Sequence, residues 1–335
     1  MPTALDFGTR FRTVQSAVTP VPFDAGNVRT VELPRSFLFK TIILRLLGTF
    51  TSTVGGTAVA AECPLNLIRK IELIADGRKT LFSIDGPSAY RLGHLMRGKE
   101  PERQFPSGFG VQGPTTFSAT FILDNMAARM VSSVDSYFDP RPYEKVELRI
   151  TWGTIADIVV GGTATVNAGT QVDVQIEQTT VGADLGLFNR LLTFDETTVT
   201  AVTSAMTINC PRSGLLTGIL FRCYSNGAPS DTILNFLSLK SDNNFLHADR
   251  LDYSTLQRRN VVDFQIDGDP PTTTTSGGKM PVGYCYLDLT EDGLITSALN
   301  TLDLNVLQLI LDVDAPVGTS FIHPSYVFYE PIPAA

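Results

Sequence analysis

The order of elements expected in the first half of the chain is repeated in its second half. Phe121-Ile-Leu-Asp-Asn125 in the first half is answered by Cys285-Tyr-Leu-Asp-Leu289 in the second. The aspartates of the two segments, Asp124 and Asp288, are 164 residues apart, about half of the 335-residue chain. Solenoid repeats have periods of roughly 20–50 residues. The longer repeat therefore predicts two similar domains in tandem, an arrangement that favours a protein built into assemblies.

Each half is expected to contain a hairpin followed by a short helix. In the first half the hairpin is expected over residues 67–84, with Asp76-Gly77 as its two-residue turn. Asp85-Gly86-Pro87 then begins a helix, because proline suits the first helical turn. Residues 233–258 show the same order of hairpin and helix in the second half.

The composition favours strands packed into sandwiches. Hydrophobic residues make up 43% of the chain, which is enough for a core in each half, and charged residues only 18%. Valine, threonine, isoleucine and phenylalanine are abundant, and these residues suit a half-buried strand. We predict a mainly all-β protein with two tandem eight-stranded jelly rolls, each with short helices in its loops. The low charge density also suggests that partners cover much of the surface.

The chain is expected to divide into four parts. These are an irregular N-terminal arm at 1–28, a first jelly roll at 29–182, a linker at 183–190 and a second jelly roll at 191–335. Each roll is expected to contain a further helix between two late strands, over 126–137 and over 290–300. The Gly-rich stretch at 161–169 is expected to be a flexible tip.

The net charge and the hydropathy pattern argue against several classes of function. A net charge of −8 argues against nucleic-acid binding, which uses clusters of Lys and Arg. No apolar run is long enough to span a bilayer. Asp6, Arg10 and Arg12 stand where a signal peptide would be apolar. We therefore expect a protein made in the cytoplasm, without a cleaved signal and without direct sequence-specific contacts to nucleic acid.

The residue types that usually carry catalysis are scattered along the chain. His94, His247 and His323 are isolated, and none lies in a His-x-His or His-x-x-x-His pair. Gly108-Phe-Gly110-Val-Gln-Gly113 has the glycine spacing of a dinucleotide-binding loop. Pro114 follows at the point where that site would need a helix, so a bent loop is the better interpretation. We predict no enzymatic activity.

Metal binding has weak support in the sequence. The pairs Asp267/Asp269 and Asp312/Asp314 are candidates for a Ca²⁺ site, but they lack the spacing and glycine of an EF-hand loop. Solvated acids at loops and strand ends are the alternative interpretation. No other cofactor is expected. The four cysteines form no Cys-x-x-Cys pair and are expected to be buried free thiols.

The tandem halves, the helix between two late strands in each half, the chain length and the N-terminal arm point to one known family. On these features the chain resembles the double jelly-roll major capsid proteins of tailless icosahedral bacteriophages with an internal membrane. The resemblance covers nearly the whole chain, and it concerns architecture because no short motif defines the family. It implies homotrimers of pseudo-hexagonal outline that form a capsid lattice, assembled in the host cytoplasm and found in the virion.

The resemblance also implies partners and surfaces. Penton and minor capsid proteins are expected as neighbours, and viral membrane lipids or membrane proteins as further contacts. The arm is expected on the inner surface of the shell, with Phe7, Arg10, Phe11 and Arg12 as contact residues. A terminus without a role is the alternative. The polar loop 267–281 is expected to be an exposed outer tip that carries Thr272, Thr273, Thr274 and Thr275.

A carbohydrate-binding or adhesive β-sandwich protein is the competing class of function. Sites of that kind stack sugars on exposed aromatic rings. The aromatic residues of this chain are mostly phenylalanine, 20 of them, which suits burial better. The single tryptophan, Trp152, follows an alternating strand and is compatible with a place in the core.

Overall fold

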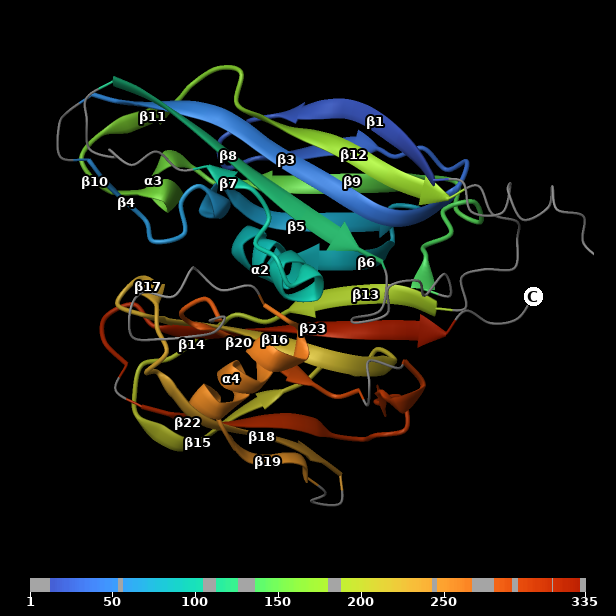
Figure 1. Cartoon of the computed structure of the whole chain (residues 1–335), viewed down its shortest axis with the longest axis vertical. Coiled ribbons are helices and arrows are strands. Elements are labelled where there is room, and N and C mark those ends of the chain that lie inside the picture. The colour runs from blue at the N-terminus through green and yellow to red at the C-terminus, as the bar shows by residue number, and fades with distance from the viewer. Residues whose placement is uncertain are drawn as a thin grey trace, which may run out of the picture. The chain divides into compact units, whose positions relative to one another are not determined.

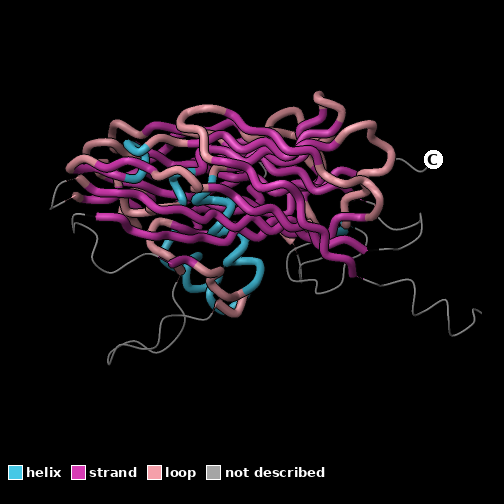
Figure 2. Tube along the Cα trace, turned by 90° about the horizontal axis from the view of Figure 1, so that it is seen from above, coloured by secondary structure: helices cyan, strands magenta, loops and turns pink. Residues whose placement is uncertain are grey.

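Two compact units make up the chain in the computed structural model. Unit 1 comprises Met1–Gly93, Pro101–Arg190 and Pro331–Ala335, and unit 2 comprises His94–Glu100 and Leu191–Glu330. Strands account for most of the described trace (Figure 2). The structure describes residues 13–53, 57–104, 113–125, 136–179, 188–242, 246–266, 280–290, 295–314 and 316–331.

The first half of the chain contains eight principal strands in two sheets (Figure 1). In chain order they are β1 (Thr13–Pro22), β2 (Val28–Glu32), β3 (Leu38–Ser52), β5 (Ile68–Ala75), β6 (Lys79–Ile84), β8 (Gly113–Asp124), β9 (Val146–Trp152) and β12 (Gln171–Thr179). One sheet has the order β1-β12-β3-β8, and the other has the order β2-β9-β5-β6. Numbered from first to eighth, the strands therefore lie in the orders 1-8-3-6 and 2-7-4-5. All neighbouring strands are antiparallel.

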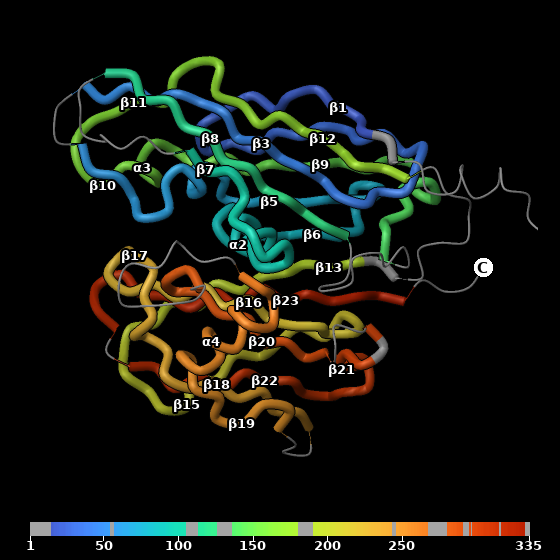
Figure 3. Tube along the Cα trace, viewed as in Figure 1, coloured from blue at the N-terminus to red at the C-terminus, as the bar shows by residue number. Residues whose placement is uncertain are grey.

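The second half repeats this arrangement with eight strands of its own. They are β13 (Phe188–Phe194), β15 (Thr203–Asn209), β16 (Leu215–Ser225), β18 (Leu234–Ser241), β19 (Leu246–Asp252), β20 (Tyr284–Asp288), β22 (Leu307–Val313) and β23 (Phe321–Pro331). The sheet orders are β13-β23-β16-β20 and β15-β22-β18-β19, again 1-8-3-6 and 2-7-4-5. The prediction of two jelly rolls with one topology is confirmed. In both rolls the first and last strands lie side by side, as the colours of Figure 3 show.

Short elements complete each roll. The first contains β4 (Ala58–Val59), η1 (Leu65–Leu67), α2 (Gly86–Arg97), β7 (Arg103–Gln104), α3 (Ile155–Ile158), β10 (Val159–Gly161) and β11 (Ala164–Val166). The second contains β14 (Thr197–Thr198), β17 (Ala228–Pro229), α4 (Tyr253–Asp263), η3 (Ile295–Ser297) and β21 (Leu299–Asn300). Helices α2 and α4 each follow the fifth strand, as the repeated pattern predicted.

Local residues explain how these hairpins and helices begin. Asp76 and Gly77 have φ values of 50° and 66°, and this left-handed pair forms the tight turn between β5 and β6, with the Arg78 N–H donating to the Ala75 carbonyl. The Asp85 carboxylate accepts a hydrogen bond from the Ser88 N–H at 3.2 Å, in the first turn of α2. The Asp252 carboxylate plays the same part for α4, with the Thr255 N–H at 2.7 Å. Hydrogen bonds from Thr255 and Ser254 lower the pKa of Asp252, so its charged form stabilises the helix start.

Alternating burial supplies the core of each roll. In β3, the side chains of Ile42, Leu44 and Leu46 are all fully buried. Each such side chain stabilises the fold by about 1.5–3 kcal/mol relative to an exposed one. Trp152 is also fully buried and meets the edge of Phe23 at a ring distance of 5.2 Å, so it lies in the core as the sequence indicated. The second roll has its own apolar cluster, which includes Phe221 and residues of all the long strands around it.

The expectation of an irregular arm over 1–28 was wrong for its second part. Thr13–Pro22 forms β1, which pairs with β12 along its length. Pro20 and Pro22 suggested a loop, but an edge strand tolerates proline because only one of its sides needs N–H donors. The register shifts between Val18 and Val21, around Pro20. The first roll therefore begins before residue 29, and residues 1–12 of the expected arm lie outside the described residues.

Two further expectations on local structure need correction. The described part of the helix expected over 290–300 is a 3₁₀ turn followed by β21, which pairs with β16. Pairing with a neighbouring strand outweighs the weak helical propensity of so short a segment. Within the expected tip at 161–169, β11 pairs with the end of β3. Most of the helix expected over 126–137 lies outside the described residues, which leave out 126–135. Most of the linker expected at 183–190 does too, because 183–187 are left out.

In the part of the chain that the structure describes, no helix is long and apolar enough to cross a membrane. The four cysteines are buried and free, as the sequence indicated. Burial raises the pKa of Cys63, Cys210 and Cys223 to about 12, and it raises the pKa of Cys285 well above its usual value.

We therefore predict that none of the four thiols reacts with a maleimide in the folded protein at mildly alkaline pH. Thiolate is the reacting form, and burial suppresses both its formation and its contact with the reagent. All four should react after unfolding in guanidinium, as counted by intact mass. Thr30→Cys, on an exposed strand, is the control and should react at once. Rapid labelling of a native cysteine in the folded wild type would contradict the described cores.

Candidate functional site

Sheet edges are the positions at which a sandwich protein can join other copies or must be protected from them. A strand at an edge carries a row of backbone N–H and C=O groups that need partners. Edge strands are therefore the first place to look for the function of a chain with two sandwiches. The groups that cover the edge strands differ between the two rolls.

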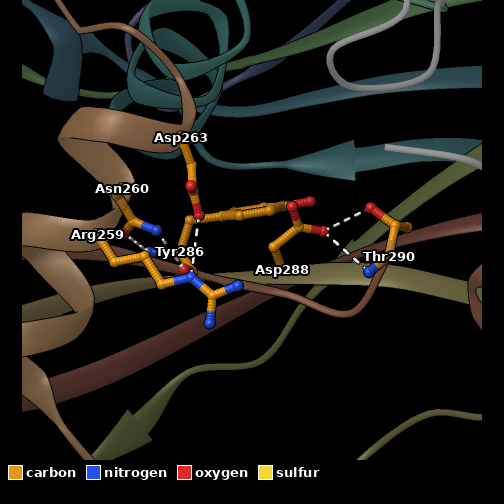
Figure 4. Close-up of polar contacts among 6 residues, drawn as sticks. All are labelled: Arg259, Asn260, Asp263, Tyr286, Asp288 and Thr290. Atoms are coloured by element: carbon orange, nitrogen blue, oxygen red, sulfur yellow. Dashed lines mark hydrogen bonds and ion pairs between the residues drawn. The ribbon is translucent and has the colours of Figure 1, made fainter. Parts of the chain in front are cut away.

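Helix α4 closes the edge at β20 in the second roll. β20 pairs with β16 on one side. On the other side, Asn260 Nδ2 donates to the carbonyl of Tyr286 at 2.8 Å, and the Tyr286 N–H donates to Asn260 Oδ1 at 2.7 Å. Figure 4 shows this two-way contact between helix and strand. Asn260 is 1% exposed, so its amide replaces a neighbouring strand in a place that water does not reach.

A second amide on the same helix face extends this closure. Gln257 Nε2 donates to the Tyr284 carbonyl at 2.9 Å and to Asp231 Oδ1 at 2.8 Å. The same Asp231 oxygen accepts the Gly283 N–H at 2.7 Å. Gln257 and Asn260 are three residues apart, so both side chains leave α4 on one face. Together they bind two carbonyls and one N–H of the β20 edge.

The aromatic ring of Tyr286 packs closely against the neighbouring strand β16. A Cβ atom at Gly218 on β16 would overlap the Tyr286 hydroxyl, so this position needs glycine. Phe264, just after α4, packs edge-on against the Tyr286 ring at 5.4 Å. Hydrogen bonds of 2.7 and 3.0 Å from Thr290 to Asp288 fix the chain after β20 (Figure 4).

The exposed side of α4 carries an ion pair between Arg259 and Asp263, with 3.1 Å between Nε and Oδ2. Figure 4 shows both side chains near Asn260 and Tyr286. Because the Arg259 side chain is 69% exposed, this pair contributes little to stability. The buried amides, and not the surface charges, hold the helix to the strand.

The equivalent edge in the first roll is closed by other means. The short strand β7 pairs with β8 at Arg103↔Ala119 and Gln104↔Ser118. Helix α2 lies so close to β8 that a Cβ atom at Gly93 would be 2.9 Å from the Ile122 carbonyl oxygen. The sixth strand is therefore covered in both rolls. In the first roll β7 and the close contact at Gly93 cover it, and in the second roll the side-chain amides of α4 cover it.

Charged residues lie on the edge strand β2 and beside or on its neighbour β9. β2 carries Arg29, whose Nε lies 2.9 Å from an Asp24 carboxylate oxygen. On the adjacent strand β9, Glu147 lies between Lys145 at 2.7 Å and Arg149 at 3.1 Å. The hydrogen bond from Lys145, together with that from Arg149, holds the pKa of Glu147 below its ordinary value. This face of the first roll therefore stays charged at neutral pH.

The structure describes only some of the site residues that were predicted from the sequence. Asp312 lies on β22 and exposed Asp314 follows it; no group of three or more potential metal ligands is found among the described residues. Calcium binding stays a prediction. The remaining candidates lie outside the described residues: Phe7, Arg10, Phe11, Arg12, Asp267, Asp269, Thr272, Thr273, Thr274 and Thr275.

Sequence reasoning missed Gln257 and Asn260. Their signal was two amides, three residues apart, on a helix whose buried face also carries Tyr253 and Leu256. A polar residue at a buried helical position needs a fixed partner. The sequence could indicate that such a partner exists, but it could not indicate that the partner is the backbone of β20.

No family model matches the chain, and no curated protein is similar to it in sequence. Solved structures do match. The major capsid protein of Sulfolobus Turreted Icosahedral Virus matches with a TM-score of 0.74 at 14% identity, over 95% of this chain and 96% of that chain. The major capsid protein P2 of Bacteriophage PM2 matches with a TM-score of 0.61 at 12% identity, over 95% and 98%.

A capsid structure of the PBCV-1 virus also matches, with a TM-score of 0.61 at 11% identity, over 96% of this chain and 94% of that chain. The fold is that of the double jelly-roll capsid proteins. The resemblance predicted from the sequence is therefore confirmed for the architecture. One of the three similar proteins comes from a bacteriophage, so the kind of host stays a prediction.

We predict that Asn260→Leu destabilises the second roll while leaving its apolar packing nearly unchanged in volume. The substitution leaves the buried N–H and C=O of Tyr286 without their described partner, at a cost of about 2 kcal/mol or more. Calorimetry should show a lower unfolding temperature, and hydrogen–deuterium exchange at Tyr284–Asp288 should accelerate.

The control is Arg258→Leu, an exposed position on the same helix. It should change the free energy of unfolding by no more than about 0.5 kcal/mol. Equal effects of the two substitutions would contradict the role given to the Asn260 amide.

Proposed function

We propose that this chain is a major capsid protein, which forms homotrimers that tile an icosahedral virion shell. The observation that carries the proposal is the repeated strand order, 1-8-3-6 and 2-7-4-5, in both halves. The likeness to three capsid proteins over at least 95% of this chain supports it. The role is structural and not enzymatic.

The trimer follows from the internal repeat. A chain with two similar rolls presents two similar lobes. Three such chains around an axis give six lobes, a pseudo-hexagonal outline that can tile a surface. Heterologous contacts between identical subunits give a closed ring when the rotation between neighbours closes, here after three chains.

The competing carbohydrate-binding or adhesive function finds no support in the aromatic residues. Trp152 is fully buried. Among the residues whose side chains the structure describes, no phenylalanine, tyrosine or tryptophan is exposed, and the exposed large apolar side chains are valine and leucine. A sugar-stacking platform would need at least one exposed ring.

The finer parts of the proposal concern partners. In the virion, the shell formed by this protein would meet penton and minor capsid proteins, and an internal membrane beneath it. The segment 1–12, which precedes β1, would contact neighbouring subunits or membrane lipids or proteins through Phe7, Phe11, Arg10 and Arg12. Two arginines contribute only about 1 kcal/mol each near an anionic surface, so they would assist binding and not provide it alone. The loop 267–281 would face outward, and assembly would take place in the host cytoplasm.

We predict that the purified protein is a trimer, with a mass three times the chain mass of 36.4 kDa by light scattering. Negative-stain images should show particles of hexagonal outline, or closed shells under assembly conditions. A single-chain mass at micromolar concentration and native salt would contradict the proposal. A dimer would contradict the six-lobed geometry.

We predict that deletion of residues 1–12 leaves the trimer intact but prevents closed shells. The deletion must stop before Thr13, because β1 belongs to the first roll. Paired variants separate the contributions: Phe7→Ala/Phe11→Ala removes apolar anchors, and Arg10→Ala/Arg12→Ala removes charge. A normal yield of shells from the deleted protein would refute a role for this segment and leave the trimer proposal standing.

A further inference from the structure

The first roll has a cavity near the start of β1. Its volume is about 450 Å³, and its lining comes from the end of β2, the residues before β3 and one residue of the loop before β9: Glu32, Leu33, Pro34, Arg35, Ser36 and Arg141. Leu33 is 2% exposed and gives the lining an apolar part. Glu32, Arg35 and Arg141 are exposed. The cavity is therefore open to solvent and mainly polar.

One charged group in this lining lacks an ion-pair partner. The guanidinium of Arg141 donates to both carboxylate oxygens of Asp139, at 2.8 and 2.7 Å, so its charge is matched. Arg35 donates to the Tyr143 carbonyl, and no carboxylate of the described residues forms an ion pair with it. A carbonyl group accepts a hydrogen bond but carries no net charge. The Arg35 guanidinium therefore has donors and a charge left for an acidic group.

The register of three strands places the start of β1 beside the cavity. Thr13 pairs with Thr179, and Thr179 pairs with Leu38. Thr13 and Leu38 therefore lie two strand spacings apart, about 10 Å. Figure 1 shows β1, β12 and β3 side by side. Leu38 comes two positions after Ser36, which lines the cavity.

A buried glutamine joins β1 to the same lining. Ser16 Oγ donates to Gln178 Oε1 at 2.9 Å. Gln178 Nε2 lies 3.5 Å from the Pro34 carbonyl oxygen, and the Gln178 side chain is in a residue that is only 1% exposed. The contact holds the beginning of β1 against the residues that lead into β3. The segment that precedes Thr13 therefore starts next to the cavity.

Residues 1–12 contain a group that matches Arg35. Asp6 is the only acidic residue in this segment. It precedes Thr13 by seven residues, which span at most about 23 Å when extended, so its carboxylate can reach the cavity.

The basic residues of the segment fit the same lining. Arg10 and Arg12 follow Asp6, and Glu32 offers them a charge of opposite sign. A lining with charges of both signs suits a segment with both signs better than it suits a free anion. The segment also belongs to the same chain, which keeps its effective concentration at the cavity high.

We propose that the Asp6 carboxylate binds the Arg35 guanidinium of the same chain in this cavity. The inference rests on the role in assembly proposed above for residues 1–12, and it names the place where that segment is held. The cavity is larger than one carboxylate, so the adjacent Leu5 can contact Leu33 in the lining. Docking would hold Phe7 and Phe11 near the start of β1 before assembly begins.

Disulfide trapping in the purified full chain tests this contact. Leu5→Cys and Ser36→Cys place one thiol beside Asp6 and one in the cavity lining, and both charged groups stay in place. Oxidation with diamide should give a disulfide within one chain, and the native cysteines are buried. Leu5→Cys with Thr116→Cys is the matched control. Thr116 is exposed and pairs with Thr49, eleven residues after Leu38 on β3 and about 36 Å from it, beyond the reach of the segment.

Charge variants in the cavity pair test the ion pair itself. Asp6→Asn changes no residue of the described roll, and it should slow disulfide formation about twofold to fivefold, the effect of a solvent-exposed ion pair. Arg35→Glu should slow it at least as much, and Asp6→Arg combined with Arg35→Glu should restore the rate. Arg258→Glu, exposed on α4, is the control and should leave the rate unchanged. In about 1 M salt the rate should fall to that of Asp6→Asn, because salt screens exposed charges.

Three results overturn the proposal. One is a cavity pair that forms no disulfide, or forms it no faster than the control pair. Another is a rate that neither Asp6→Asn nor salt lowers. The third is a disulfide that joins two chains, seen as a dimer on a non-reducing gel, because the segment then reaches the cavity of another copy.

Failure of this contact is distinguishable from failure of the proposed function. Trapping needs only the purified protein, whereas the capsid role is tested by the trimer mass and the shells of the wild-type chain. Trimers and shells without trapping refute only the docking of Asp6. A wild-type chain that forms neither refutes the capsid role, whatever the trapping shows.

Discussion

Backbone hydrogen bonding at sheet edges is the constraint on which the rest of this structure depends. Each roll arranges its eight strands in the orders 1-8-3-6 and 2-7-4-5, and the outermost strand of any sheet has a neighbour on one side only. An N–H or C=O group that is buried without a partner costs about 1–3 kcal/mol. The chain meets this requirement with short strands, with a helix that carries two amides, and with charged edge strands. Among the described strands, β1 pairs on one side only, with β12.

The two rolls show that one topology can be supported by different side chains. Their strand orders are the same, and a helix follows the fifth strand in both. Yet the sixth strand is covered by β7 and a close approach at Gly93 in the first roll. In the second it is covered by Gln257 and Asn260. The two rolls therefore share a strand order and differ in the side chains that cover the sixth strand. Two similar but distinct lobes are what a six-lobed trimer of identical chains would present to its neighbours.

The proposed shell function is argued from the order of the strands and not from reactive side chains. Burial raises the pKa of the cysteine thiols, which favours their neutral form and keeps reagents away from them. His94 and His323 are buried. Among the described residues, the features with the clearest consequence for assembly are the strand edges. Under the proposed function, copies of the chain would be joined at such edges.

The sequence alone determined the tandem repeat, the hairpin turn at Asp76-Gly77, the helices after the fifth strands and the burial of Trp152 and the cysteines. These depend on local patterns of hydrophobic residues, glycine and proline, which can be read along the chain. Only the tertiary structure decided that Thr13–Pro22 is a strand, because its pairing partner β12 lies some 150 residues later. The same holds for Asn260, whose partner is the backbone of Tyr286. Pairing between distant segments is not encoded in either segment, so the pairing of β1 with β12 and the closed edge at β20 emerge only when the sheets are formed.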